Sequence, residues 1–361
     1  MIGYWNNVEG FVRDGITSRE QQILAILLEK QPLQSSEIHS RMTDEEVSLV
    51  TIKRALSDLV AKQLIIAAES GRATAYTVST RGRVFAAIDA GRYCAVEPDK
   101  RFGMRRYNFD LFADMPQAIL SDAERAVLSE ATIAYVHKTA DLPPAIEKKE
   151  LERLIIELSW KSSRIEGNTY TLLDTERLLL EHTEAAGHDH QEAQMILNHK
   201  DAFTFVHTNA QQFRTLNRAN LEQLHAILVK DMGVGIGLRT RAVGVVGSLY
   251  QPLENVYQIQ EGVEALSSAV GRMETPYEKA LLALLGINYL QPFEDGNKRT
   301  SRLMANAILL AYGCAPLSYR SVDENEYREA ILVFYELNSI VPFKKIFIDQ
   351  YLFAAQNYTV R

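Results

Sequence analysis

Two apolar segments joined by a short polar loop are the feature that most constrains the fold of this chain. Residues 281–290 and 303–312 are mostly apolar, and the stretch between them carries Asp295, Gly296, Asn297, Lys298 and Arg299. A glycine lets backbone N–H groups turn inward, and the start of the following helix offers unpaired donors. The stretch therefore favours the binding of an anion. Arg299 and Arg302 stand three residues apart and can face one phosphate chain from a helix. The sequence therefore predicts a phosphate-binding site.

Length and composition bound the class of protein. With 361 residues and a prior of roughly 150 residues per domain, two or three domains are expected. The net charge of −7 means that any nucleic-acid contact requires a local basic patch. Cys94 and Cys314 are far apart, which favours neither a disulfide framework nor a thiolate metal site. No export signal precedes the first domain and no apolar run approaches the ~18 residues of a membrane span, so we expect a cytoplasmic protein without membrane contact.

The N-terminal 85 residues show a pattern of three helices followed by two strands. Helices are expected over residues 17–30, where Thr17 and Glu20 form a capping box, and over 35–42 and 48–62. Two strand-like segments, 64–68 and 74–78, then flank a turn and read as a β-hairpin. Three helices followed by a hairpin resemble the winged helix-turn-helix architecture, and the run from Thr51 to Ile65 resembles a recognition helix leading into the wing.

This resemblance implies a DNA-binding face. Contacts to phosphates or base edges are expected from Thr51, Lys53 and Arg54, with further candidates at Arg72, Arg81 and Arg83. The acidic residues Asp44, Glu45 and Glu46 dilute this basic face. A protein-interaction module with a solvated charged helix is the alternative.

Residues 86–116 carry little periodicity and are expected to be a linker, and the remainder, 117–361, is expected to be helical. Helices are predicted over residues 122–139, 145–164, 172–182, 191–208, 221–230, 276–290, 297–312, 322–338 and 343–353. Capping boxes start two of them, formed by Ser121 with Glu124 and by Thr275 with Glu278. His188 and His190 invite a metal interpretation, but loop histidines without matching carboxylates are usually only solvated.

The polar loop also carries a family resemblance. Residues 291–302 read Gln-Pro-Phe-Glu-Asp-Gly-Asn-Lys-Arg-Thr-Ser-Arg. They resemble the Fic (Fido) signature His-Pro-Phe-x-(Asp/Glu)-Gly-Asn-Gly-Arg-x-x-Arg, whose family moves AMP from ATP onto a protein hydroxyl. Gln291 stands where the family has its catalytic histidine, and Lys298 stands where it commonly has a second glycine. The resemblance implies a mainly α fold, with a helical core and a β-hairpin flap beside the small α/β winged-helix domain.

A second motif precedes the signature. Ser162, Glu166 and Gly167 match the inhibitory motif (Ser/Thr)-x-x-x-Glu-(Gly/Asn) at the end of a helix over about 145–167. Its N-terminal position resembles class II of the family, in which the glutamate reaches the second signature arginine, here Arg302, and excludes the ATP γ-phosphate. A guanidinium that is paired with a carboxylate is no longer available to bind a phosphate. The alternative is that these residues only finish a helix.

The helical pattern stops between residues 237 and 256. The alternation and turns of this segment predict a hairpin, in the place where the family carries the flap that holds the target by strand pairing. Val243, Val245 and Pro252 mark it, and we call residues 243–252 the flap. An ordinary surface hairpin is the alternative.

The resemblance also implies roles for single residues. Asp295 would hold Mg²⁺ between the α- and β-phosphates of ATP, and a hard cation with few carboxylates and several phosphate oxygens suits magnesium. Phe293 would anchor the loop in the core. The anion hole and the phosphate contacts would come from Gly296, Asn297, Arg299 (β-phosphate) and Arg302 (γ-phosphate). Lys298 adds a point charge but is typical of the Doc branch, which transfers a phosphoryl group.

Gln291 bears on activity because a glutamine amide cannot take the proton of an attacking hydroxyl. General-base assistance is worth roughly 10²- to 10⁴-fold in rate. Three interpretations stay open. The chain could be a slow adenylyltransferase in which Gln291 replaces a natural histidine, a nucleotide-sensing DNA-binding regulator with a native Gln291, or a phosphoryl transferase. The expected partners are ATP, Mg²⁺, a protein target or the chain itself, DNA through residues 1–85, and a second copy in a homodimer.

Overall fold

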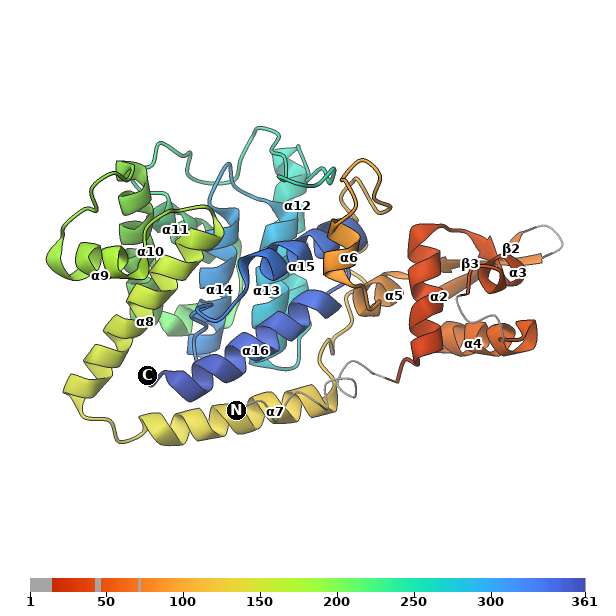
Figure 1. Ribbon diagram of the computed structural model, residues 1–361, viewed down its shortest axis with the longest axis horizontal. Helices are drawn as coiled ribbons and strands as arrows, with labels where there is room; N and C mark the ends of the chain where they lie inside the picture. The colour runs from red at the N-terminus through yellow and green to blue at the C-terminus, as the bar shows by residue number, and fades with distance from the viewer. Residues whose placement is uncertain (1–14, 43–46, 71–72, 361) are drawn as a thin grey trace. The chain divides into compact units, whose positions relative to one another are not determined.

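The computed structural model describes residues 15–42, 47–70 and 73–360. It is mainly helical, with one small antiparallel sheet near the N-terminus (Figure 1). By compactness the chain divides into two units, which we describe separately. Unit 1 holds residues 1–116, 244–251 and 325–345, and unit 2 holds residues 117–243, 252–324 and 346–361. The domain boundaries expected near residues 85 and 117 stay a prediction.

Unit 1 begins with the expected winged-helix elements. Its helices and strands are α2 (Ser18–Glu29), β1 (Leu33–Gln34), α3 (Ser35–His39), α4 (Leu49–Ala61), β2 (Ile65–Ser70) and β3 (Ala73–Val78). The capping box of Thr17 and Glu20 starts α2 as predicted. The strands pair in the order β1-β3-β2, with Ile65 opposite Val78. The core between α2, α4 and the sheet is formed by Ile23, Leu24, Leu27, Ile52, Leu56 and Leu59.

The linker of unit 1 contains helical structure and packs against α15 (Glu324–Leu337). The short helix α5 (Thr80–Phe85) ends directly before the linker, and a second short helix, α6 (Ala90–Cys94), lies in its first part. Tyr93 of α6 is buried together with Val333 and Leu337 of α15. The linker therefore packs through α6 on the C-terminal part of α15.

Unit 2 is built around α13 (Pro276–Leu290) and α14 (Asn297–Ala311), which lie side by side. Thr275 and Glu278 form the predicted capping box of α13, and nearly every α13 side chain is buried. Around this pair lie α7 (Asp122–Thr139), α8 (Pro144–Ile165), α9 (Leu172–Glu181), α10 (His190–Thr208), the 3₁₀ turn η1 (Ala210–Arg214), α11 (Arg218–Leu228), α12 (Val256–Arg272) and α16 (Val341–Asn357). These two almost completely buried helices thus hold the polar loop between them.

Three details correct the sequence interpretation. The helix α12, which that interpretation omits, has Ile259, Val263, Leu266 and Val270 at helical spacing in the core. The helix expected from residue 322 begins only at Glu324. The β-hairpin predicted for the flap is wrong, because residues 243–252 contain a turn near Gly247 and no paired strands. In place of a hairpin partner, the backbone of Gln251 bridges Arg106 of the linker.

Within the described residues, no helix has the length and apolar character needed to cross a bilayer.

Candidate functional site: a cationic helix start closed by a glutamate

The loop between α13 and α14 has a fixed conformation. Gln291 ends α13 in the left-handed region with φ of 46°, and its side-chain amide donates to the Asn288 carbonyl at 2.7 Å. The Asn297 amide bridges the loop, since its oxygen accepts from the Phe293 N–H at 2.9 Å and its nitrogen donates to the Phe293 carbonyl at 2.8 Å. The side chain of Asn297 therefore shapes the loop and leaves anion contacts to the backbone.

Gly296 is the N-cap of α14 and has a positive φ of 76°. A Cβ at this position would come within 3.1 Å of Val229 and 3.4 Å of the Arg299 guanidinium. A side chain here would be strained and would crowd the space beside Arg299. The glycine therefore keeps the helix start accessible to a ligand.

Three cations follow from the first turn of α14. Arg299 is buried and pairs with Asp295 at 3.1 Å. Burial lowers the pKa of Arg299, with Asp295 opposing that shift. Arg302 is fully buried, whereas the side chain of Lys298 is 40% exposed. This end of α14 thus concentrates positive charge and unpaired helix N–H groups.

A carboxylate already occupies this cationic site. Glu166, at the C-cap of α8, accepts from the Arg302 guanidinium at 2.9 Å and from the Lys298 ammonium at 3.3 Å. Ser162 adds two contacts to Arg302, through its hydroxyl and its carbonyl, both at 2.8 Å. Burial opposes the charged form of Glu166, but Arg302 and Lys298 outweigh it and lower the pKa. The predicted inhibitory residues and signature cations therefore lie together.

Further ion pairs hold α8 in place on unit 2. Glu324 accepts from Lys161 and from Arg164, each at 3.0 Å. Glu157 pairs with Arg320 and accepts from the hydroxyl of Tyr358. Gly167 follows Glu166 with φ of 99° and ends the helix. The carboxylate of Glu166 is thus presented by a helix end that ion pairs fix just before the motif and within it.

Sequence reasoning missed His225 of α11. Its ring stacks on Phe293 with centroids 3.7 Å apart, and its Nε2 lies 2.9 Å from the Asp295 carbonyl oxygen. Burial lowers the pKa of His225 to about 4, so the neutral ring donates that hydrogen bond near pH 7. His225 therefore supports the loop from beneath. No local pattern could identify it, because it is about 70 residues from the loop in sequence.

Sequence reasoning also missed the role of Arg239. Its buried guanidinium donates to the carbonyls of Arg241, Gln291 and Leu253. The backbone N–H of Arg239 donates to the Pro292 carbonyl at 3.0 Å. One side chain therefore joins both ends of the segment that contains the flap to the residue in the motif histidine position.

The other candidates lie elsewhere. Lys53 and Arg54 are exposed on α4 and Thr51 is half-buried, whereas Arg72 and residues 43–46 lie outside the described part of the chain. His188 contacts Thr169 and Glu192, and His190 contacts Glu184. Across residues 15–42, 47–70 and 73–360 no three His, Cys, Asp or Glu side chains are grouped to hold a metal.

Two family models match this chain. The first, described as Fic/DOC family, matches residues 215–309, which include α11, the flap, α13 and nearly all of α14. The second, described as Penicillinase repressor, matches residues 16–89, which include α2 to α5 and the sheet. The chain therefore contains a Fic/DOC family domain, preceded by a winged-helix domain of the penicillinase repressor type.

Curated relatives are similar at moderate identity. A protein adenylyltransferase Fic from Nematostella vectensis is 28% identical over 188 residues, which cover 50% of this chain and 44% of the relative. The adenylyltransferase Fic from Drosophila willistoni is 26% identical over 231 residues, 63% of this chain and 44% of the relative. The chain spans less than half the length of these curated relatives.

Solved structures share the fold. A Fic domain containing signaling protein from Bacteroides thetaiotaomicron superposes with a TM-score of 0.52 at 20% identity, covering 64% of this chain and 94% of that one. Fic-1 from C. elegans superposes with a TM-score of 0.55 at 19% identity, covering 65% and 72%. At this identity the likeness concerns the fold alone.

The pKa of His225 gives the first prediction. A pKa of about 4 in the fold, against 6.5 ordinarily, means that the unfolded chain binds the extra proton between these values. Stability is then lost as the pH falls through that window, by about 2 kcal/mol between pH 7.5 and pH 5 for this residue. The variant His225→Gln, which can still donate but cannot titrate, should show a smaller loss in urea unfolding at the two pH values. Equal losses in the two proteins would contradict the assignment.

Proposed function

We propose that this chain is a protein adenylyltransferase that transfers AMP from ATP to a Ser, Thr or Tyr hydroxyl of a target protein or of itself. The observation that carries the proposal is the carboxylate of Glu166 seated on Arg302 and Lys298 at the start of α14. A site that holds an internal anion between helix N–H groups and buried guanidinium groups has the charge needed for a triphosphate. The similarity to adenylyltransferase Fic proteins supports AMP as the transferred group.

The roles of the residues follow from their places. Arg299 and Arg302 would contact the β- and γ-phosphates, and the backbone of Gly296 and Asn297 would bind an equatorial phosphate oxygen. Asp295 fits a magnesium ion, because its carboxylate is the exposed partner of Arg299 at the mouth of the loop, with 64% of the side chain accessible. Bound there, magnesium would offset charge on the phosphates.

In the transfer, the target hydroxyl oxygen forms a bond to the α-phosphorus and the bond to the β-phosphate oxygen breaks, releasing pyrophosphate. The hydroxyl proton must leave in this step. Gln291 has no basic nitrogen, and its side-chain N–H donates a hydrogen bond to the Asn288 carbonyl. His225 is buried beneath the loop with a pKa near 4 and holds the Asp295 carbonyl, so it does not replace the base. The chain as written is therefore a slow enzyme.

Autoinhibition by Glu166 belongs to the same proposal. While Glu166 and Ser162 hold Arg302, the guanidinium is not available for a γ-phosphate, and the lowered pKa keeps Glu166 charged at neutral pH. Lys298, which stands where the family commonly has a glycine, forms a second ion pair with Glu166. ATP binding must break both ion pairs.

A second candidate function is a nucleotide-sensing DNA-binding regulator. It is favoured by the exposed Lys53 and Arg54 on α4 of a penicillinase repressor-type domain, together with the missing base. A Doc-like phosphoryl transferase, favoured by Lys298, is a third. We place the protein in the cytoplasm and leave a homodimer as an expectation.

The transfer itself is tested by restoring the base and removing the inhibitor. The double variant Gln291→His and Glu166→Gly should incorporate label from ATP labelled on the α-phosphate, about 10²- to 10⁴-fold faster than Glu166→Gly alone. Adding Arg302→Ala to the double variant is the control and should abolish the gain. Incorporation from the γ-phosphate but not from the α-phosphate would overturn AMP transfer in favour of phosphoryl transfer.

The inhibitory role is tested by binding. Glu166→Gly should bind ATP at least about tenfold more tightly than the parent with Gln291 in place, because charge-assisted hydrogen bonds of ~1.5–3 kcal/mol no longer compete for Arg302. Isothermal titration calorimetry measures this, with Glu152→Gln on the exposed face of α8 as the matched control. Equal affinities of the parent and Glu166→Gly would contradict autoinhibition.

The regulator is tested with the full chain in gel retardation at low salt. Lys53→Ala and Arg54→Ala should each weaken DNA binding and flatten the plot of log affinity against log salt by about one unit. Lys149→Ala, an exposed lysine of α8, is the charge-matched control. Absence of retardation for any DNA at low salt would end this alternative.

A further inference from the structure

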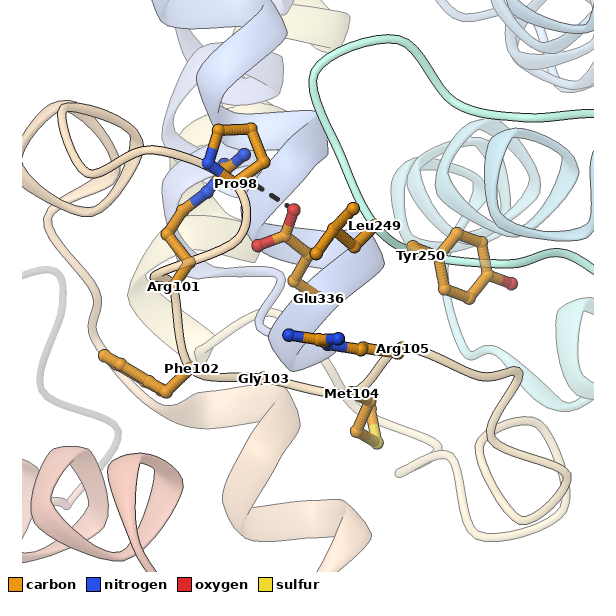
Figure 2. A pocket seen from close by; sticks show the side chains of 9 residues that line it. All are labelled: Pro98, Arg101, Phe102, Gly103, Met104, Arg105, Leu249, Tyr250 and Glu336. Carbon is orange, nitrogen blue, oxygen red and sulfur yellow. Dashed lines mark ion pairs between the residues drawn. The ribbon is translucent and has the colours of Figure 1, made fainter.

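The flap is held by a buried carboxylate outside the nucleotide site. Glu336, near the C-terminus of α15, is 5% exposed and accepts a hydrogen bond from the Ser248 hydroxyl of the flap at 2.6 Å. It also accepts from the Tyr93 hydroxyl at 2.7 Å and pairs with Arg101 at 3.5 Å. Figure 2 shows Glu336 between the linker residues Arg101 to Arg105 and the flap residues Leu249 and Tyr250.

The same linker residues contact the flap directly. The Arg101 guanidinium donates to the Gly247 carbonyl, and the N–H of Gln251 donates to the Arg105 carbonyl at 2.8 Å. The linker is itself fastened to α15, because the N–H of Met104 donates to the Glu336 carbonyl at 2.7 Å. Gly103 allows this approach, since a Cβ there would lie 2.8 Å from the same oxygen at a φ of 140°.

The flap side chains divide into anchored and exposed groups. Ser248 faces Glu336, and Tyr250 is buried and stacks on Tyr335 of α15 with centroids 5.6 Å apart. The side chain of Val246 is 96% exposed and that of Leu249 is 38% exposed. Without paired strands of its own, the flap depends on these anchors for its shape.

We propose that Glu336 is a positioning residue for the protein target: it fixes the flap through Ser248 and ties the flap to the linker through Arg101 and Tyr93. The proposal rests on the proposed function in taking the flap as the segment that holds the target. A buried carboxylate suits this position because it accepts hydrogen bonds from the Ser248 and Tyr93 hydroxyls and also pairs with the charged guanidinium of Arg101. Burial and Glu336 raise the pKa of Tyr93 far above its usual value, which keeps the phenol a donor.

Amide hydrogen exchange in the full chain tests the anchoring directly. Glu336→Gln and Ser248→Ala should each exchange at least about tenfold faster over residues 247–251 than the parent, while residues 291–302 exchange unchanged. Ser248→Thr, which keeps the hydroxyl, should restore parental exchange. Lys100→Ala is the matched control, because Lys100 lies on the same linker and its ammonium pairs with Glu97 at the surface. Unchanged exchange over residues 247–251 in both Glu336→Gln and Ser248→Ala would overturn the proposal.

Labelling kinetics separate positioning from general stability. In the Gln291→His and Glu166→Gly background, Glu336→Gln should lower the maximal rate of self-labelling at least about tenfold, with the ATP concentration at half-maximal rate unchanged. An unchanged maximal rate, or a loss confined to ATP affinity, would overturn the positioning role. If the background variant takes up no label, the proposed transfer fails, and the exchange measurement still decides whether Glu336 holds the flap.

Discussion

The structure of unit 2 depends on how the buried guanidinium of Arg302 is paired. A fully buried charge is tolerated only when hydrogen bonds and an opposite charge surround it. Ser162 and Glu166 provide these contacts, so the end of α8 must lie against the start of α14. The ion pairs of Glu157 and Glu324 then fix the rest of α8. The ion pair of Glu166 with Arg302, which we propose closes the nucleotide site, is therefore also part of the packing of the core.

Helix starts were predictable because capping is local. The capping boxes of Thr17, Ser121 and Thr275 lie where the sequence indicates them, since each needs only residues three positions apart. The Fic signature and the inhibitory motif also located the residues that meet at the start of α14. The hairpin of the flap was wrong, because alternation alone does not supply a partner strand, and Gly244 and Gly247 favour an irregular backbone.

Long-range supports could not be predicted. The contacts of His225 with Phe293, of Arg239 with Gln291 and Leu253, and of Glu336 with Ser248 each connect residues that are 14 to 88 positions apart. Such contacts leave no periodic signal, and a lone buried histidine, arginine or glutamate in a sequence is not distinguishable from a surface one. They nevertheless set the shape of the loop and the flap. The sequence thus located the residues expected to meet the ligand better than those that hold them.

Gln291 and the buried arginines near it differ in how far their side-chain contacts reach. Arg299, Arg302 and Arg239 are buried and hydrogen-bonded, so changing any of them would leave carboxylates or carbonyls of the core without their donors. The amide of Gln291 donates to the Asn288 carbonyl three residues earlier, a local contact at the end of α13. The backbone turn at this residue and its contact with Arg239 do not depend on the side chain. Under the proposed function, the side chain at position 291 would therefore affect the removal of the target's proton, while Arg299 and Arg302 keep their contacts with Asp295 and Glu166.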